Sequence, residues 1–109
     1  MNHEEYIDSV RTRIGHAAKE MLNGNKNYLE GAIEIASLYH EAEIEENNTD
    51  FNIFIGISSE TDHLPIGEMR KNWSKEALEK YEAEIQKTTK WAKDISLNQC
   101  NSLANKYGT

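Results

Sequence analysis

The sequence predicts an all-α protein, a compact bundle of three main helices plus a short buried helix, with the last main helix being long. Three observations predict this class. The chain of 109 residues contains one proline and six glycines, which favours long regular elements over many turns. Apolar residues recur at helical spacing along most of the chain. Only residues 51–57 alternate as a strand would, and a lone strand would leave its backbone groups unpaired.

Apolar stripes predict the first two helices. The first stripe, with spacings of three and four, consists of Ile7, Val10, Ile14, Ala17 and Met21. Gly and Asn at residues 23–25 should end this helix, because both tolerate a left-handed backbone. The second helix is expected over about residues 27–45, with apolar residues on more than one face, so it should contact neighbours on two sides. Gly31 within it lowers helix propensity by roughly 1 kcal/mol, which close packing against another helix would explain.

The short helix is predicted over residues 51–57, after a turn at 46–50 (ENNTD). Thr49 or Asp50 could cap this helix. A helical conformation would place Phe51, Phe54 and Ile55 on one face, so we predict a buried helix despite the strand-like alternation.

The following stretch, ETDHLPIGEMR, is predicted to reverse the chain between the short helix and the last one. Thr61 or Asp62 could cap a new turn that starts near Leu64, and Pro65 is tolerated in the first turn of a helix. Leu64 and Ile66 would then anchor this corner in the core.

The last helix should begin after Ser74, a suitable N-cap, run to about Lys106 and end at Gly108. Its apolar stripe comprises Leu78, Tyr81, Ile85, Thr88, Ala92 and Ile95, and then drifts to Cys100, Leu103 and Tyr107. At about 1.5 Å per residue such a helix approaches roughly 50 Å, so we expect a kink or break near residues 94–98. The sequence contains no linker or internal repeat, and residues 1–109 are expected to form a single helical domain.

Charge is unevenly distributed along the chain, whose net charge is −7. Residues 27–69 contain ten acidic residues and no Lys or Arg. A surface of this kind would steer a basic protein toward it. It argues against nucleic acid as a partner, because phosphate binding requires a basic surface. The alternative interpretation is an acidic face that only contacts solvent.

Other features predict a cytoplasmic protein. The first sixteen residues are too polar for a secretory signal, and no apolar run approaches the ~20 residues of a membrane span. The single Cys100 cannot form an internal disulfide. Because it falls on the apolar stripe of the last helix, we expect a buried, inert thiol.

Candidate chemistry is concentrated at Glu60, Asp62 and His63, two carboxylates and an imidazole within four residues. They could act as acid and base, or as metal ligands, if a cleft held them. The structural interpretation makes them part of a corner in which Arg70 offers a counter-charge to Glu60 or Asp62. Two other pairs have helical spacing but lack the remaining ligands of a metal site, His16/Glu20 and His40/Glu43. We therefore predict no catalytic residue, no metal and no cofactor.

Three segments carry a resemblance to other proteins: MLNGNKNYLEGAIEIASL, SSETDHLPIGEMRKNWSKEAL and WAKDISLNQCNSLANKYG. Over roughly residues 17–108, the chain resembles a small bacterial family of unknown function with a Ser-Glu-Thr-Asp-His-Leu-Pro-x-Gly signature followed by Trp-Ser. The signature corresponds to residues 59–67 and to Trp73 and Ser74. This resemblance implies a family rather than an activity, and it supplies no catalytic residues.

Small acidic proteins of this kind also resemble the immunity proteins of bacterial toxin systems, including contact-dependent growth inhibition. That resemblance implies a non-enzymatic antitoxin that covers the active site of a cationic toxin domain, with a nuclease as the expected class. The expected contact surface consists of Glu41, Glu43, Glu45, Glu46, Asp50, Glu60 and Asp62. The alternatives are a small metal-dependent or acid/base enzyme centred on Glu60, Asp62 and His63, and a helical module that dimerises through its last helix.

Overall fold

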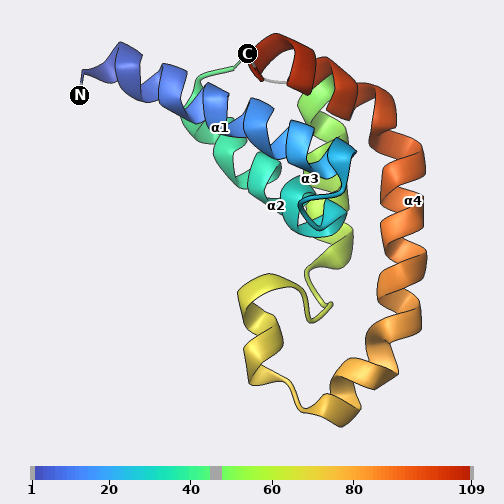
Figure 1. Cartoon of the computed structure of the whole chain (residues 1–109). Coiled ribbons are helices and arrows are strands. Elements are labelled where there is room, and N and C mark those ends of the chain that lie inside the picture. The colour runs from blue at the N-terminus through green and yellow to red at the C-terminus, as the bar shows by residue number, and fades with distance from the viewer. Residues whose placement is uncertain (1, 45–47, 109) are drawn as a thin grey trace.

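The computed structural model describes residues 2–44 and 48–108, which contain α-helices and 3₁₀ helices and no strand. Figure 1 shows α1, α2 and α3 gathered together, while α4 runs along one side of this group and packs its C-terminal part on α1 and α3. The predicted all-α class is confirmed. The elements are α1 (His3–Asn23), α2 (Tyr28–Tyr39), η1 (His40–Ala42), α3 (Thr49–Thr61), η2 (Gly67–Asn72) and α4 (Lys75–Tyr107).

α1 follows its predicted stripe and its predicted end. The side chain of Asn2 accepts a hydrogen bond from the Glu5 N–H at the start, and Gly24 adopts a left-handed conformation (φ 83°) at the end. All five stripe residues are buried. Gly15 lies where α4 crosses α1, and a Cβ there would overlap the backbone of Tyr107 and Gly108. Only glycine allows the two helices to approach this closely.

α2 is central, as predicted, because it packs on α1 and α3. A Cβ on Gly31 would overlap the side chain of Met21 in α1, which confirms the close packing expected there. The predicted extension of this helix to residue 45 is wrong, since α2 ends at Tyr39 and η1 follows. The reason is tertiary: Arg11 of α1 donates through Nε to the Ala42 carbonyl (3.0 Å) and through Nη2 to the Glu43 carbonyl (3.2 Å). These bonds satisfy carbonyls that lack a helical partner at a helix C-terminus, and they hold the chain where Glu43 adopts a left-handed conformation (φ 50°).

α3 confirms the helical prediction for residues 51–57 and extends it to Thr61. Its cap differs from the expected one: the Asn48 side chain accepts from the Asp50 N–H, and Thr49 and Asp50 lie inside the first turn. Ile57 is buried, whereas Ile55 is half-buried. Residues 46 and 47 of the predicted turn lie outside the part of the chain that the structure describes, and Thr49 and Asp50 of that turn belong to α3 instead.

The corner after α3 is anchored as predicted but capped differently. Leu64 is buried and Ile66 packs partly buried against the core. Asp62 is the C-cap residue of α3, and the buried Thr61 hydroxyl donates back to the Ile57 carbonyl, so neither residue caps a new turn. The 3₁₀ helix η2 begins only at Gly67, after an extended residue, and has no side-chain cap.

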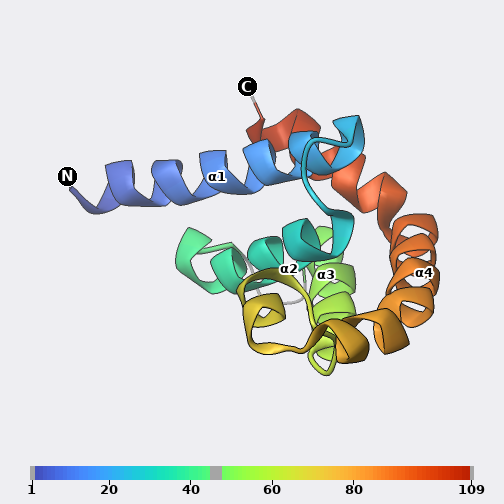
Figure 2. The same ribbon diagram turned by 60° about the horizontal axis from the view of Figure 1, so that its bottom comes forward.

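α4 begins and ends as predicted, with the Ser74 hydroxyl accepting from the Ala77 N–H and with Gly108 following its last residue. The helix is unbroken through residues 94–98, although Figures 1 and 2 show it changing direction along its length. The Ser96 hydroxyl donates to the Ala92 carbonyl (2.6 Å), a back-bonding that often bends helices. Ser96 also takes the buried position expected for Ile95, which is 37% exposed. No helix in the described residues is long and apolar enough to cross a membrane.

Candidate functional site

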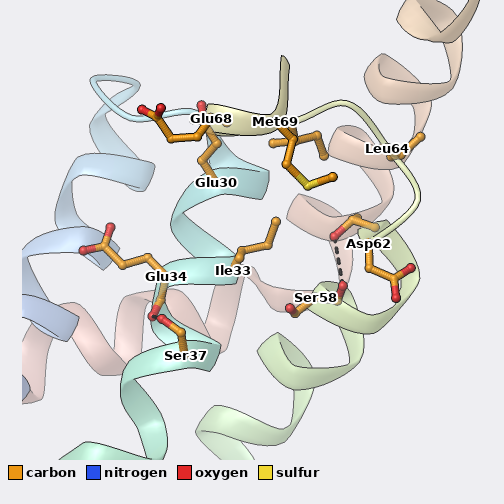
Figure 3. A pocket seen from close by; sticks show the side chains of 12 residues that line it. Glu30, Ile33, Glu34, Ser37, Ser58, Asp62, Leu64, Glu68 and Met69 are labelled. Atoms are coloured by element: carbon orange, nitrogen blue, oxygen red, sulfur yellow. Dashed lines mark hydrogen bonds between the residues drawn. The ribbon is translucent and has the colours of Figure 1, made fainter. Parts of the chain in front are cut away.

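An open pocket of about 490 Å³ lies between α2, the C-terminal end of α3 and the segment that leads to α4 (Figure 3). Residues of the signature segment form one wall, because Thr61, Asp62, Leu64, Ile66 and Gly67 all line it. The chain reversal that the signature builds therefore also creates this concavity. We regard this pocket as the candidate functional site.

The floor of the pocket is apolar. Figure 3 shows Ile33 of α2 and Met69 of η2 pointing toward one another. Leu64, in the segment that follows α3, also lines the pocket. Met69 is 54% exposed, one of few large apolar side chains in the described residues that solvent reaches so freely. Methionine is unbranched and adapts its shape to bound groups, so it suits the wall of a binding pocket.

Four carboxylates line the same pocket, and no Lys or Arg does: Glu30, Glu34, Asp62 and Glu68. Two of them already have cationic partners, since Lys26 Nζ lies 2.6 Å from Glu34 and Lys71 Nζ lies 2.9 Å from Glu68. The second pair is almost fully exposed and adds about 0–1 kcal/mol at most. Glu30 and Asp62 form no ion pair with any described residue.

Gly67 explains how the Glu30 carboxylate fits beside the corner. It has a positive φ of 68°, and a Cβ there would lie 3.3 Å from Glu30 Oε1. A left-handed backbone and a close neighbour both favour glycine. The glycine that ends the Pro-x-Gly pattern thus shapes the rim of the pocket.

The structure divides the predicted contact residues between the two ends of α3. Asp62 lines the pocket, and Glu60 lies near it on the outer face of the same turn. Glu41 and Glu43 lie beside the N-terminal part of α1, where the Tyr6 hydroxyl donates to Glu41 (2.7 Å). Glu45 and Glu46 fall outside the residues that the structure describes. The 13 residues of α3 separate its two ends by roughly 18 Å, so the predicted acids do not form one patch.

Asp50 at the other end of α3 is engaged within the fold. Ser102 and Lys106 of α4 both donate to its Oδ2 at 2.9 Å. The hydrogen bond from Lys106 lowers the pKa of the Asp50 carboxyl, although partial burial opposes this change. A carboxylate in this position ties α3 to α4 and has less capacity for an external partner.

Glu60 and His63 border a second, shallower hollow of about 340 Å³, together with Glu84 and Trp91 of α4. His63 Nε2 lies 2.8 Å from Glu84 Oε1, and this hydrogen bond raises the pKa of His63. The expected ion pair of Arg70 with Glu60 or Asp62 is wrong, because neither distance falls within ion-pair range. His63 instead binds the corner to α4 through Glu84.

The described residues contain no group of three or more His, Cys, Asp or Glu side chains arranged to hold a metal ion. The Glu60, Asp62 and His63 side chains are all exposed. No single cleft encloses the three, because Asp62 lines the pocket whereas Glu60 and His63 border the second hollow. Cys100 is fully buried, as predicted, and its Sγ lies 3.5 Å from the Ala18 carbonyl. Burial raises the pKa of this thiol to about 11.

The pocket contains four lining residues that were not predicted from the sequence: Glu30, Glu34, Glu68 and Met69. A signal for two of them was present, because Glu30 and Glu34 are one helical turn apart and flank Ile33. Nothing local indicated that residues 62–69 would fold back over this face of α2.

Comparison with known proteins places the chain in a family. No curated protein and no solved structure matches it. One family model, described as a protein of unknown function (DUF2489), matches residues 2–103, which is nearly the whole chain. The chain therefore belongs to the DUF2489 family.

Proposed function

We propose that this protein is an immunity protein, which binds a cationic protein toxin and neutralises it without acting as an enzyme. A nuclease domain is the toxin class that fits best. Such a domain presents a basic cleft to nucleic acid, and carboxylates can occupy that cleft in place of phosphates. The observation that carries the proposal is the absence of Lys and Arg from residues 27–69, which hold ten acids.

The fold adds support by separating the charges. The acidic segment comprises α2, α3 and the corner, whereas residues 70–109, mainly α4, contain eight basic and five acidic residues. The part of the molecule formed by residues 27–69, which we call the acidic side, is therefore net negative, although its acids do not form one patch. A surface of one charge raises the association rate with an oppositely charged partner, and this matters for an inhibitor that competes with nucleic acid.

Capture of the partner and a growth assay test the proposal together. Immobilised protein would be exposed to lysate of the producing cell at low salt and eluted at roughly 0.5 M salt, where exposed charges are screened within a few ångströms. We expect one basic protein in stoichiometric amount. Its expression alone should arrest growth, and coexpression with this chain should restore it.

A pair of charge-reversed variants tests whether the acidic side is the contact surface. Glu43→Lys with Glu60→Lys changes two expected contact residues. Glu79→Lys with Asp94→Lys makes the same change in net charge at exposed positions on α4. We expect the first variant to lose growth protection and the second to retain it. A captured protein that is harmless when expressed alone, or protection that survives both variants, would contradict the proposal.

A further inference from the structure

The pocket between α2 and the corner combines two surfaces that few ligands satisfy together. Its floor is apolar, through Ile33, Leu64 and Met69, and its rim carries the unpaired carboxylates of Glu30 and Asp62. A purely apolar group would cover the floor but withdraw water from the carboxylates at a cost. A small hydrated cation would leave the apolar floor exposed. A long side chain with an apolar stem and a cationic head satisfies both surfaces.

The local electrostatics favour a cation at this place. Asp62 is the C-cap residue of α3, and the last carbonyls of a helix carry negative partial charge. Among the described residues no cation lines the pocket, and Lys26 already pairs with Glu34. Glu30 and Asp62 therefore remain available to an external group.

An arginine fits this arrangement better than a lysine. Figure 3 shows Glu30 of α2 and Asp62 at the end of α3 on opposite sides of the pocket, so a guanidinium group would contact one of these carboxylates at a time. A guanidinium group has five donors in a planar fork, which matches the two oxygens of a single carboxylate. It is also more weakly hydrated than an ammonium group, which lowers the cost of placing it beside Met69.

We infer that this pocket receives an arginine side chain of the basic partner, with its stem on Ile33, Leu64 and Met69 and its guanidinium group at one of the rim carboxylates, Glu30 or Asp62. The identity of the partner rests on the proposed function. The chemistry of the pocket does not, because a small guanidinium compound should bind to it in the absence of any protein partner.

Methionine methyl groups provide the readout. The chain has three methionines, and Met69 lines the pocket whereas Met21 is buried in the core at 2% exposure. Protein labelled with ¹³C at the methionine methyls would be titrated with N-butylguanidinium and followed by NMR. We expect the Met69 signal to shift and saturate while the Met21 signal stays in place. N-butylurea, a neutral compound of similar shape, should bind about tenfold more weakly or less.

Two matched variants test whether the carboxylates at the rim of the pocket bind N-butylguanidinium. The variant Glu30→Gln, Asp62→Asn, Glu68→Gln removes three of the four pocket carboxylates and leaves Glu34, which pairs with Lys26. The variant Glu79→Gln, Glu82→Gln, Asp94→Asn removes three exposed carboxylates of α4. We expect N-butylguanidinium to bind the first variant about tenfold more weakly and the second with wild-type affinity. Unchanged Met21 signals in both variants would show that the core is intact.

Three outcomes would overturn the inference. They are an unshifted Met69 signal, equal binding of N-butylurea, and equal or tighter binding of n-pentylammonium, which mimics lysine. Each is distinct from failure of the proposed function. A toxin could bind elsewhere on the acidic side, and the pocket could bind guanidinium although no toxin exists.

Discussion

The hydroxyl oxygen of Tyr28 lies 2.7 Å from Oγ of Ser96, and this buried hydrogen bond joins α2 to α4 across 68 positions of the chain. The Ser96 hydroxyl donates to the Ala92 carbonyl of its own helix, so the Tyr28 hydroxyl is the donor between the two side chains. Burial raises the pKa of Tyr28 to about 12, and the phenol stays protonated at neutral pH.

Removal of the acceptor, Ser96, should destabilise the protein more than removal of the donor hydroxyl of Tyr28. Ser96→Ala leaves the buried Tyr28 hydroxyl without its acceptor, and we expect a loss of about 1–3 kcal/mol in the free energy of unfolding. Tyr28→Phe leaves Ser96 bonded to Ala92, so about 1 kcal/mol is expected. Urea unfolding followed by circular dichroism measures both, with the exposed Ser37→Ala as a control. A larger loss for Tyr28→Phe than for Ser96→Ala would show that the donor is assigned wrongly.

Substitution by alanine should lower the stability of the protein at Gly15 and raise it at Gly56. Gly15→Ala places a methyl group against the backbone of Tyr107 and Gly108, and we expect overpacking to cost about 1–3 kcal/mol or more. Gly56 lies within α3 with no neighbouring atom within 4 Å of an added Cβ, so Gly56→Ala should raise stability by up to about 1 kcal/mol. Thermal unfolding of both variants checks the pair. Equal effects would show that α4 does not cross α1 at Gly15.

Cys100 should be unreactive in the folded protein. Burial excludes reagents and raises the pKa of the thiol to about 11, which keeps the nucleophilic thiolate rare at neutral pH. We expect Ellman's reagent to leave the folded protein unmodified at pH 7 and to label one thiol per chain in denaturant. Rapid labelling of the folded protein would contradict the burial of this side chain.

The His63–Glu84 pair should make stability depend on pH in a defined direction. The hydrogen bond to Glu84 raises the pKa of His63 above its usual value of 6.5, so the folded state binds a proton more tightly than the unfolded state. The stabilisation is therefore complete below pH 6.5 and is lost as the pH rises through the folded pKa. We expect the difference in unfolding free energy between wild type and Glu84→Gln to fall as the pH rises above 6.5.

The variant Glu82→Gln is the matched control for Glu84→Gln. Glu82→Gln removes an exposed carboxylate nearby on α4 whose partner is Gln86, a group that does not titrate. Its difference from wild type should stay nearly constant over the same range. A difference for Glu84→Gln that is flat, or that grows with pH, would show that His63 and Glu84 do not interact in solution.

Local chemistry made much of the fold predictable. The stripe from Ile7 to Met21, the stop at Gly24 and the cap at Ser74 are properties of short segments, and the structure confirms each of them. The helical conformation of residues 51–57 was predictable by a different argument. A single strand would have had no partner for its backbone groups.

Errors arose where a distant residue changed a local preference. Periodicity predicted α2 to residue 45, but α2 ends at Tyr39, and Arg11 of α1 binds the carbonyls of Ala42 and Glu43 in the segment that follows. The apolar pattern placed Ile95 in the core, but the hydroxyl of Tyr28 makes Ser96 the buried residue. Arg11 and Tyr28 both lie far along the chain from the segments that they contact, so short-range patterns could not reveal these contacts.

The sequence by itself determined the helical class, the end of α1, both ends of α4 and the acidic character of residues 27–69. Only the tertiary structure decided which acids lie together. Backbone hydrogen bonds and apolar spacing act over a few residues and can be read along the chain. Glu30, Asp62 and Met69 line one pocket only because the corner folds over α2, and the position of the corner is set by contacts between segments far apart in sequence.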